Sequence, residues 1–369
     1  MNLECLKPGQ WIGSGFGDNT FNSVILELDE SDGGLAGSVY AFDTNHRLPS
    51  VFASLRLSNT KRVQDVVIDL QALDPKSQAI IPFERVTEIW PQSAISPQAK
   101  IRLSFVDEEI HAQWRSDFGL SGECTLWRAE TIDADEVKRN QRPISWKEFQ
   151  EEVSNTAFEE QVFRGQSGDW PLRSSFHRTD ANDLISYFEK CLPSVRRQLT
   201  PFLKGSSFDG DEGELALLHL LQHYGYPTPL IDWSYSPFIA AFFSYAPRES
   251  NGRYVFTFDK KGWEKHHKPK TRVGFCEPHL SLVEALPILN ERSLPQQGLS
   301  MMTNIASVEA YILAREEKYQ EQYLSMVQLR DEDRRQALTD LSLMGISPAS
   351  VYPGLEGACQ AMKAKHFGY

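Results

Sequence analysis

The stretch LQHYGYPTPLIDWSYSP, residues 221–237, decides the fold of the larger part of this chain. It continues the run 214–223, which is apolar on nearly all sides and from which we expect a buried helix. An extended segment then delivers Asp232, Trp233 and Ser234, and Pro237 suits the first turn of another helix. Polar side chains placed between apolar elements in this way predict a cleft that is lined with polar groups.

The elements around this stretch alternate between helical and strand patterns. Ser145 and Glu148 have the spacing of a capping box, which predicts that a helix starts there. Gly345 suits the left-handed position that follows a last helix. Further helices are expected over 180–191, 212–223, 237–245 and 331–343, and strands over 161–164, 231–233, 253–259 and 324–329. We therefore expect an α+β domain over 145–369.

A second motif is VFRGQS, residues 162–167, followed by WPL at 170–172. Arg164 stands at the end of a predicted buried strand, which would hold its guanidinium in a fixed position. Gly165 follows it and has no side chain, so the backbone there can approach a ligand closely. The planar guanidinium suits a carboxylate or a diphosphate. The alternative is that Arg164 pairs with an internal carboxylate.

A third motif is NERSLPQQGL, residues 290–299, expected as a polar strand and turn. It carries amide and guanidinium groups that can form paired hydrogen bonds, on Asn290, Arg292 and Gln296. By itself this stretch would pass as a surface loop.

The run KKGWEKHHKPK, residues 260–270, holds five lysines, two histidines and a tryptophan. An exposed, solvated loop is the first expectation. The functional alternative is a contact for a phosphate backbone or an acidic partner. In that case Lys261, Lys265 and Lys268 would supply charge, and Trp263 would stack on a base.

Two common kinds of catalytic site are not favoured in the predicted cleft. His219 and His223 have the spacing of zinc ligands, but the run HLLQH lacks the general-base glutamate of HExxH, so we expect no metal. A hydrolytic triad of Ser234, His223 and Asp232 is conceivable, yet no nucleophile-elbow sequence supports it. Capping or core hydrogen bonds remain the alternative role of His223 and Asp232.

Residues 1–130 show short strand patterns separated by Gly, Pro, Asn and Asp. A hairpin is expected where the strand ending at 30 passes through the turn 31–34 into a strand over 35–42. This spacing predicts an all-β sandwich or small barrel, with sensing or the docking of a partner protein as its default role. The polar segment 131–144 is the expected linker.

Composition supports an ordinary globular protein of 369 residues with about two domains. The formal charge of −12 argues against a general nucleic-acid coat. However, 13 basic and 21 acidic side chains precede residue 141, against 25 and 29 after it, so most of the excess acidity lies in the β-domain. Five scattered cysteines without a CxxC fit a reducing cytoplasm, and neither a secretory signal nor an apolar run long enough to cross a bilayer is present.

Taken together, the three motifs resemble the FRG domain, a bacterial family named for its Phe-Arg-Gly motif. The matching residues include Phe163, Arg164 and Gly165, the stretch 221–237, and the third motif. A closing element at 343–357, with LMGI and YPGLEG, completes the order. The resemblance covers roughly residues 145–367.

The motif order of this family looks like that of ADP-ribosyltransferase folds. It implies that Arg164, Ser234 and Gln296 occupy three catalytic positions, with Asp232 as a further catalytic candidate. It also implies that NAD lies against a set of binding residues: Phe163, Gly165, Gln166, His223, Tyr224, Trp233, Asn290 and Arg292. Those transferases usually place a glutamate where this chain has Gln296, and an amide cannot act as a general base. Either Asp232 or Glu291 then supplies the carboxylate, or the cleft binds without reacting.

The resemblance therefore implies a cytoplasmic effector that transfers ADP-ribose to a nucleic acid or a protein, acting as a toxin in phage defence or a related conflict. The alternative is a non-catalytic module that holds a nucleotide or a nucleic-acid end while the β-domain docks a partner. A weaker alternative is a scaffold in which both domains serve assembly only.

Overall fold

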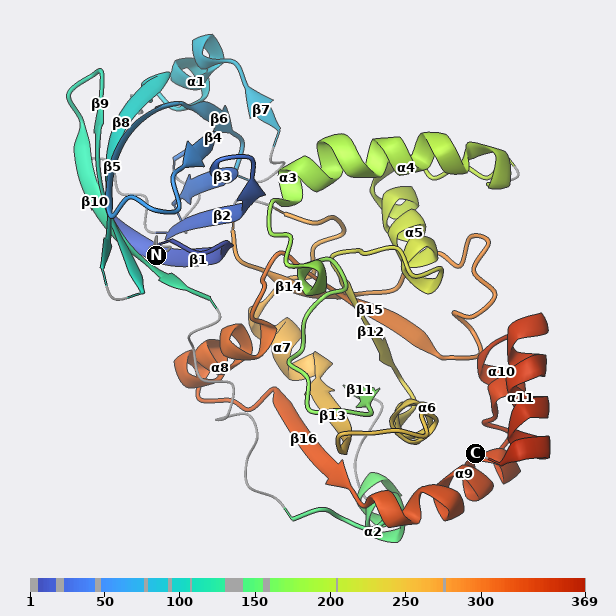
Figure 1. The fold of residues 1–369 in the computed structure, drawn as a ribbon. Helices are drawn as coiled ribbons and strands as arrows, with labels where there is room; N and C mark the ends of the chain where they lie inside the picture. Colours follow the sequence, from blue (N-terminus) through green and yellow to red (C-terminus); the bar gives the residue numbers. More distant parts are fainter. Residues whose placement is uncertain are drawn as a thin grey trace.

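The computed structural model of the chain (Figure 1) describes residues 6–17, 23–43, 48–75, 79–91, 95–106, 108–129, 142–154, 160–203, 205–274 and 277–368. It is β-rich in the N-terminal region and α+β in the C-terminal part. None of the helices in these residues combines the length and the apolar character needed to span a membrane.

The N-terminal region is one antiparallel sheet that curls on itself into a barrel (Figure 1). Its strands follow the order β5-β8-β9-β10-β1-β2-β3-β4-β6-β7, and β4 returns to contact β5. Their bounds are β1 (Gly9–Gly17), β2 (Ser23–Ser31), β3 (Gly34–Phe42), β4 (Ser50–Leu57), β5 (Val63–Asp69), β6 (Gln71–Leu73), β7 (Ile80–Ile81), β8 (Gln98–Val106), β9 (Glu109–Ser116) and β10 (Ser121–Arg128), with one short helix, α1 (Phe83–Ile89). Of the two predicted alternatives, the structure has the barrel, and the predicted hairpin is present as β2 and β3.

The C-terminal part is built on a second antiparallel sheet, in the order β14-β15-β12-β11-β13-β16. Its strands are β11 (Gln161–Gln166), β12 (Leu230–Ser234), β13 (Arg253–Asp259), β14 (Leu280–Val283), β15 (Gly298–Thr303) and β16 (Leu324–Leu329). Its helices are α2 (Trp146–Ser154), α3 (Leu184–Ser186), α4 (Leu192–Leu199), α5 (Gly210–His223), α6 (Pro237–Tyr245), α7 (Lys260–His266), α8 (Val308–Tyr319), α9 (Arg334–Leu343), α10 (Pro348–Val351) and α11 (Leu355–Phe367).

Both faces of this second sheet are buried, because side chains alternate between the faces along each strand. Val162 of β11 packs with α7 and α8 on one face, whereas the next residue, Phe163, packs with α2, α6 and α9 on the other. Helix α5 packs over the end of the sheet formed by β12, β14 and β15. The predicted α5 precedes β12 in the chain and α6 follows it, and β12 ends in Asp232, Trp233 and Ser234.

The start of α2 is the predicted capping box. The Ser145 hydroxyl accepts from the Glu148 amide at 3.2 Å, and the Glu148 carboxylate accepts from the Ser145 amide at 2.7 Å. Most of the linker expected over 131–144 lies outside the described residues, which resume at 142. The chain then enters the second sheet through a bridge between Ile144 and Leu329.

The barrel contacts the C-terminal part along β2 and β3, through the segment that leads into α3. On β2, Val24, Leu26 and Leu28 face the barrel interior, so Glu27 and Asp29 face outward. Asp29 accepts hydrogen bonds from the backbone amides of Asn182 and Asp183, at 2.7 and 3.2 Å, just before α3. Glu27 accepts from Gln10 at 3.1 Å and from the backbone amide of Leu184 at 3.3 Å. The junction is therefore a buried polar network.

A second contact secures the same junction from β1. Gln10 is fully buried and donates to the carbonyl of Asn304 at 2.6 Å, while its own oxygen accepts from the Ala306 amide at 3.0 Å. Gln10 thus ties β1 to the segment between β15 and α8.

Candidate functional site

A polar pocket opens where β11 and β12 separate. These neighbouring strands pair at a single position, Phe163 opposite Ser234, and diverge beyond it. The pocket has a volume of about 350 Å³. It is lined by residues of all three motifs: Phe163, Arg164, Gly165, Gln166, His223, Asp232, Trp233, Ser234, Arg292 and Gln296. The structure thus brings together most of the residues that the sequence singled out.

Arg164 spans the gap between the two strands. Its Nη1 donates to the backbone carbonyl of Asp232 at 2.6 Å, and its Nε donates to Gln166 Oε1 at 3.4 Å. Burial lowers the pKa of Arg164 to about 10, against the opposing effect of the Asp232 charge, so the side chain is still a cation near pH 7. Its hydrogen bonds go to neutral groups, not to an internal carboxylate, and its charge is therefore available to the pocket.

Arg178 is a second cation of the pocket and belongs to none of the three sequence motifs. It follows the buried residues Phe176 and His177, and it lines the same cavity. Burial lowers the pKa of Arg178, while the charge of Asp232 opposes that shift. Its proximity to Asp232 depends on tertiary structure, and no local motif marks it.

Arg292 is the third cation in the wall. It donates to the backbone carbonyl of His223 at 3.2 Å, pairs with the Glu356 carboxylate, and lies over the Tyr352 ring at 5.6 Å. Helix α11, which carries Glu356, thus closes one side of the site. Arg292 is partly neutralised, whereas among the described residues neither Arg164 nor Arg178 forms an ion pair with a carboxylate.

Asp232 is the carboxylate of the pocket. Gln222 Nε2 donates to its Oδ1 at 2.5 Å, and Gln222 Oε1 in turn accepts from Ser175 and Thr228. Gln222, itself held by Ser175 and Thr228, therefore orients the Asp232 carboxylate, whose charge acts on both Arg164 and Arg178. Glu291, the other carboxylate considered from the sequence, is exposed and does not line the pocket.

His219 and His223 lie one turn apart on α5, with ring centroids 4.6 Å apart. With Asp232 they form a group whose ligand atoms lie within 4.8 Å of one another, a spacing that could suit a divalent ion. However, the amide of Asn290 lies between the rings, with Oδ1 2.7 Å from His223 Nδ1 and Nδ2 3.4 Å from His219 Nδ1. In this amide orientation His219 Nδ1 accepts, so its proton is on Nε2 and one of the three ligands is lost. Hydrogen bonding accounts for the cluster without a metal.

The predicted catalytic roles of Ser234 and Gln296 meet a structural difficulty. The Ser234 hydroxyl donates to the backbone carbonyl of Gln296 at 2.7 Å and accepts from the Ser236 amide at 3.0 Å. The Gln296 side chain donates to the backbone carbonyl of Val351 at 3.1 Å. Both side chains support the turn between β12 and α6 and the contact with α10. A hydrogen bond from Ser234 to His223 is absent from the described residues, so the hydrolytic triad is not assembled.

The aromatic residues proposed from the sequence do not offer a ring to the pocket. Trp233 lies in the wall, but its indole is 3% exposed and packs 5.9 Å from Phe258 on the opposite face of the sheet. The reason is the alternation of side chains along β12, which separates Trp233 from Asp232. Tyr224 is 80% exposed and lies outside the lining. Phe163 also lines the pocket but is buried, and the lining rings with exposed surface are those of Trp170, Phe243 and Tyr352.

Gly165 is required by the packing of α6. A Cβ at this position would lie 1.8 Å from the Ala240 carbonyl oxygen and 2.9 Å from the Ser244 amide. Gln166, also buried, donates to the Trp170 carbonyl at 2.8 Å. The motif therefore fixes the position of Arg164 through the backbone of β11.

The lysine-rich run 260–270 does not form the exposed loop that was expected. Residues Lys260–His266 form α7, and Asp259 caps it by accepting from the Gly262 amide at 2.8 Å. Trp263 is 1% exposed and donates to the Leu280 carbonyl at 3.2 Å, so it cannot stack on a base. Lys261 pairs with Glu160. The proposed nucleic-acid contact therefore loses its aromatic residue, while Lys265 and Lys268 are exposed.

The fold and the site define an antiparallel α+β domain whose cleft holds an arginine between two diverging strands. The family model of the FRG domain matches residues 159–253, which include β11, α5, β12 and α6. The chain thus contains an FRG domain. Gln296 and the closing element lie beyond the matched segment.

Other comparisons add little. No curated protein matches the chain. Among solved structures, the redesigned β-barrel mFAP1 bound to DFHBI is similar at 11% identity, over 33% of this chain and 94% of that one. Its TM-score of 0.20 is too low to establish a shared fold.

Proposed function

We propose that the FRG cleft binds a nucleoside diphosphate, with NAD as the candidate ligand. The observation that carries this proposal is the placement of Arg164 and Arg178 on the wall of one polar pocket. Within the part of the chain that the structure describes, neither cation forms an ion pair with a carboxylate. Guanidinium groups suit diphosphate oxygens, because each presents a planar set of donors. The exposed indole of Trp170 and the half-buried rings of Phe243 and Tyr352 offer apolar faces to a base or to nicotinamide.

We further propose that this cleft transfers ADP-ribose to a nucleic acid or a protein. In such a transfer the bond between C1′ of the ribose and the nicotinamide nitrogen breaks, and nicotinamide leaves as a neutral molecule. A bond from C1′ to an acceptor oxygen or nitrogen forms, and the acceptor loses its proton. Asp232 is the residue suited to stabilise the positive charge that develops on the sugar, because Gln222 holds its carboxylate in place inside the pocket.

The setting implied by the family resemblance is a bacterial toxin active in phage defence or a related conflict. Under this proposal the barrel serves as the part that senses a signal or docks a partner.

A second candidate function is nucleotide binding without turnover. Two of the four side chains expected to be catalytic, Ser234 and Gln296, are engaged in hydrogen bonds that support the backbone. Such a cleft would hold a nucleotide through its arginines without a base for the acceptor.

The decisive experiment measures binding and turnover on the same set of proteins. The wild type and the Arg164→Ala, Asp232→Asn and Arg248→Ala variants are titrated with NAD, ADP-ribose and ADP by calorimetry, and incubated with labelled NAD and cell extract. Arg248 is an exposed arginine just beyond α6, outside the pocket, and serves as the matched control.

Transferase activity predicts that NAD binds to the wild type and to Arg248→Ala, that Arg164→Ala weakens binding, and that Asp232→Asn binds NAD but fails to transfer label. Binding without turnover predicts that no protein in the set transfers label although NAD or ADP binds. If none of the three nucleotides binds to the wild type, the proposal is wrong.

A further inference from the structure

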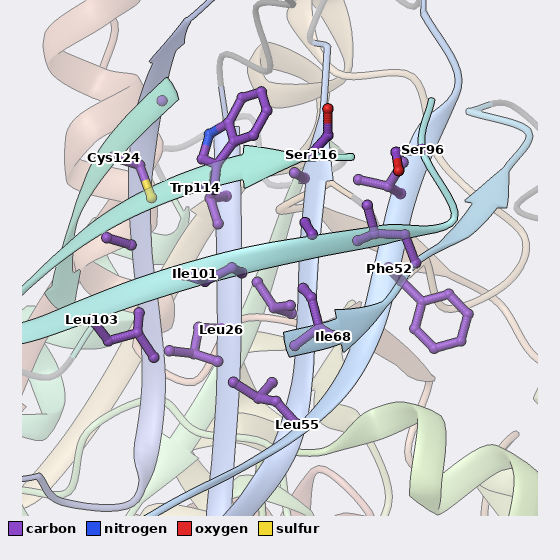
Figure 2. Close-up of a pocket in the computed structure, with 18 of the residues that line it drawn as sticks. Leu26, Phe52, Leu55, Ile68, Ser96, Ile101, Leu103, Trp114, Ser116 and Cys124 are labelled. Atoms are coloured by element: carbon purple, nitrogen blue, oxygen red, sulfur yellow. The ribbon is translucent and has the colours of Figure 1, made fainter. Parts of the chain in front are cut away.

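The N-terminal barrel encloses a cavity that the proposed function of the FRG cleft does not use (Figure 2). On β8 and β9 every second residue faces inward: Ile101 and Leu103 alternate with exposed Lys100 and Arg102, and Ala112 lies inside. The cavity has a volume of about 120 Å³. An apolar protein cavity of about 150 Å³ is known to bind benzene.

The cavity exists because several inward positions carry small residues. Gly15, Ala41, Ala99 and Ala112 come from β1, β3, β8 and β9, and all four line it. Small-barrel interiors are normally filled by their own side chains, so small residues on four strands leave space that no other side chain occupies.

The exposure of the lining supports the same conclusion. Trp114 lies on the inward face of β9, between the buried residues Ala112 and Ser116, yet it is half-buried. Ile101 on β8 and Leu120, in the turn before β10, are also half-buried although they line the interior. A filled barrel core would leave these apolar side chains covered.

The cavity has one polar end and one apolar end. In Figure 2, Ser96 and Ser116 lie at one end, while Leu26, Leu55 and Leu103 lie at the other. Ser96 Oγ accepts from the Gln98 amide at 3.3 Å, and Ser116 Oγ accepts from the Leu120 amide at 3.2 Å. Each serine therefore keeps its hydroxyl proton as a donor.

Charge restricts the ligand further. None of the described residues that line the cavity carries a Lys, Arg, His, Asp or Glu side chain. A charged ligand would lose its hydration without gaining a partner of opposite charge, which is costly in an apolar interior. The lining therefore selects against carboxylates and ammonium groups.

We propose that the barrel is a binding site for a small neutral molecule with an apolar body, such as one aromatic ring, and a single hydrogen-bond acceptor. The apolar body occupies the end formed by Leu26, Leu55 and Leu103. The acceptor oxygen lies between the hydroxyl groups of Ser96 and Ser116.

The test compares three probes of similar size against the full chain: acetophenone, which has an acceptor, ethylbenzene, which has none, and benzoate, which is charged. Binding is measured by calorimetry and by the rise in melting temperature, since a ligand of the native state raises it. We expect acetophenone to bind about five- to tenfold tighter than ethylbenzene, the value of one hydrogen bond, and benzoate to give no shift.

Variants locate the site. The double variant Ser96→Ala with Ser116→Ala should bind both neutral probes with equal affinity, while Ser104→Ala, an outward-facing serine of β8, should behave as the wild type. Ala112→Phe should fill the cavity and abolish binding of both. If Ala112→Phe does not fold, the serine variants decide alone. The proposal is overturned if neither neutral probe binds, if benzoate binds as well as acetophenone, or if the double serine variant keeps the preference for acetophenone. No nucleotide is present in these experiments, so their outcome is independent of the FRG cleft.

Discussion

Arg164 donates from Nη1 to the backbone carbonyl of Asp232 at 2.6 Å, and not to the Asp232 carboxylate. The guanidinium is thereby held in place by a neutral group, while the carboxylate is held separately by Gln222. The pocket thus contains one oriented cation and one oriented anion that do not neutralise each other directly. Such an arrangement suits a ligand that carries both charges, as NAD does.

Arg164→Lys should weaken the binding of ADP by at least about tenfold, because an ammonium cannot form the paired, planar hydrogen bonds of a guanidinium. Calorimetry measures the dissociation constant. Arg248→Lys serves as the control, and an equal loss in that variant would assign the effect to general surface charge.

Arg178→Ala should also weaken ADP binding, by about tenfold, with little change in the melting temperature, since the side chain lines the pocket but is exposed to solvent. This variant tests a residue that only the folded chain identifies. Unchanged ADP affinity would remove Arg178 from the site and leave Arg164 as its main cation.

Gly165→Ala should destabilise the protein by about 3 kcal/mol or prevent folding, because the added methyl group would meet the backbone of α6. The free energy of unfolding in urea gives the measurement. Gly298→Ala is the matched control: its nearest neighbour would be 3.6 Å away, so a loss below about 0.5 kcal/mol is expected. Comparable losses in both variants would contradict this account of the motif.

Asp29→Ala should loosen the junction between the barrel and the FRG domain. The change leaves the backbone amides of Asn182 and Asp183 without an acceptor, at a cost of about 2 kcal/mol. Hydrogen exchange should accelerate at residues 182–184 relative to Glu30→Ala, which removes an exposed carboxylate from the same strand. If both variants exchange at the same rate there, Asp29 does not hold the junction.

Acid should destabilise the protein through three buried histidines. Burial lowers the pKa of His177 and His279 to about 3, and burial together with His223 lowers the pKa of His219 to about 4. The unfolded chain, with histidine pKa values near 6.5, takes up these protons first, so the free energy of unfolding should fall as pH decreases below about 6.5.

The carboxyl groups of the junction act in the opposite direction. Burial raises the pKa values of Glu27 and Asp29, so their protonation favours the folded state as the pH falls. The histidine contribution is isolated by comparing His177→Gln with the wild type between pH 7.5 and 5.5. The slope of stability against pH should decrease by an amount that approaches about one proton at the acid end of this range. An exposed control, His366→Gln, should leave the slope unchanged.

Local patterns predicted most of the second domain well. The bounds of α6, β13 and β16 agree with expectation, because Pro237 fixes a helix start and the strands carry alternating apolar residues. Predictions failed where an expected element depended on tertiary contacts. The run 260–270 has the composition of a solvated loop, yet Trp263 is buried because α7 packs against β13 and α8.

The sequence by itself determined a β-rich region, an α+β domain and the residues of the FRG motifs, because helix caps, strand alternation and glycine positions act over a few neighbouring residues. Tertiary structure alone decided which of those side chains reach one cleft. The divergence of β11 from β12 opens the pocket, and alternation along β12 turns Trp233 away from Asp232. Contacts with α5 and α11 hold Arg292 in the pocket wall, and the fold brings Arg178 into the same lining as Arg164. Tertiary structure likewise decided that Ser234 and Gln296 support the backbone and that small residues on four strands leave one cavity inside the barrel. These outcomes depend on contacts between residues far apart in the chain, which local patterns cannot specify.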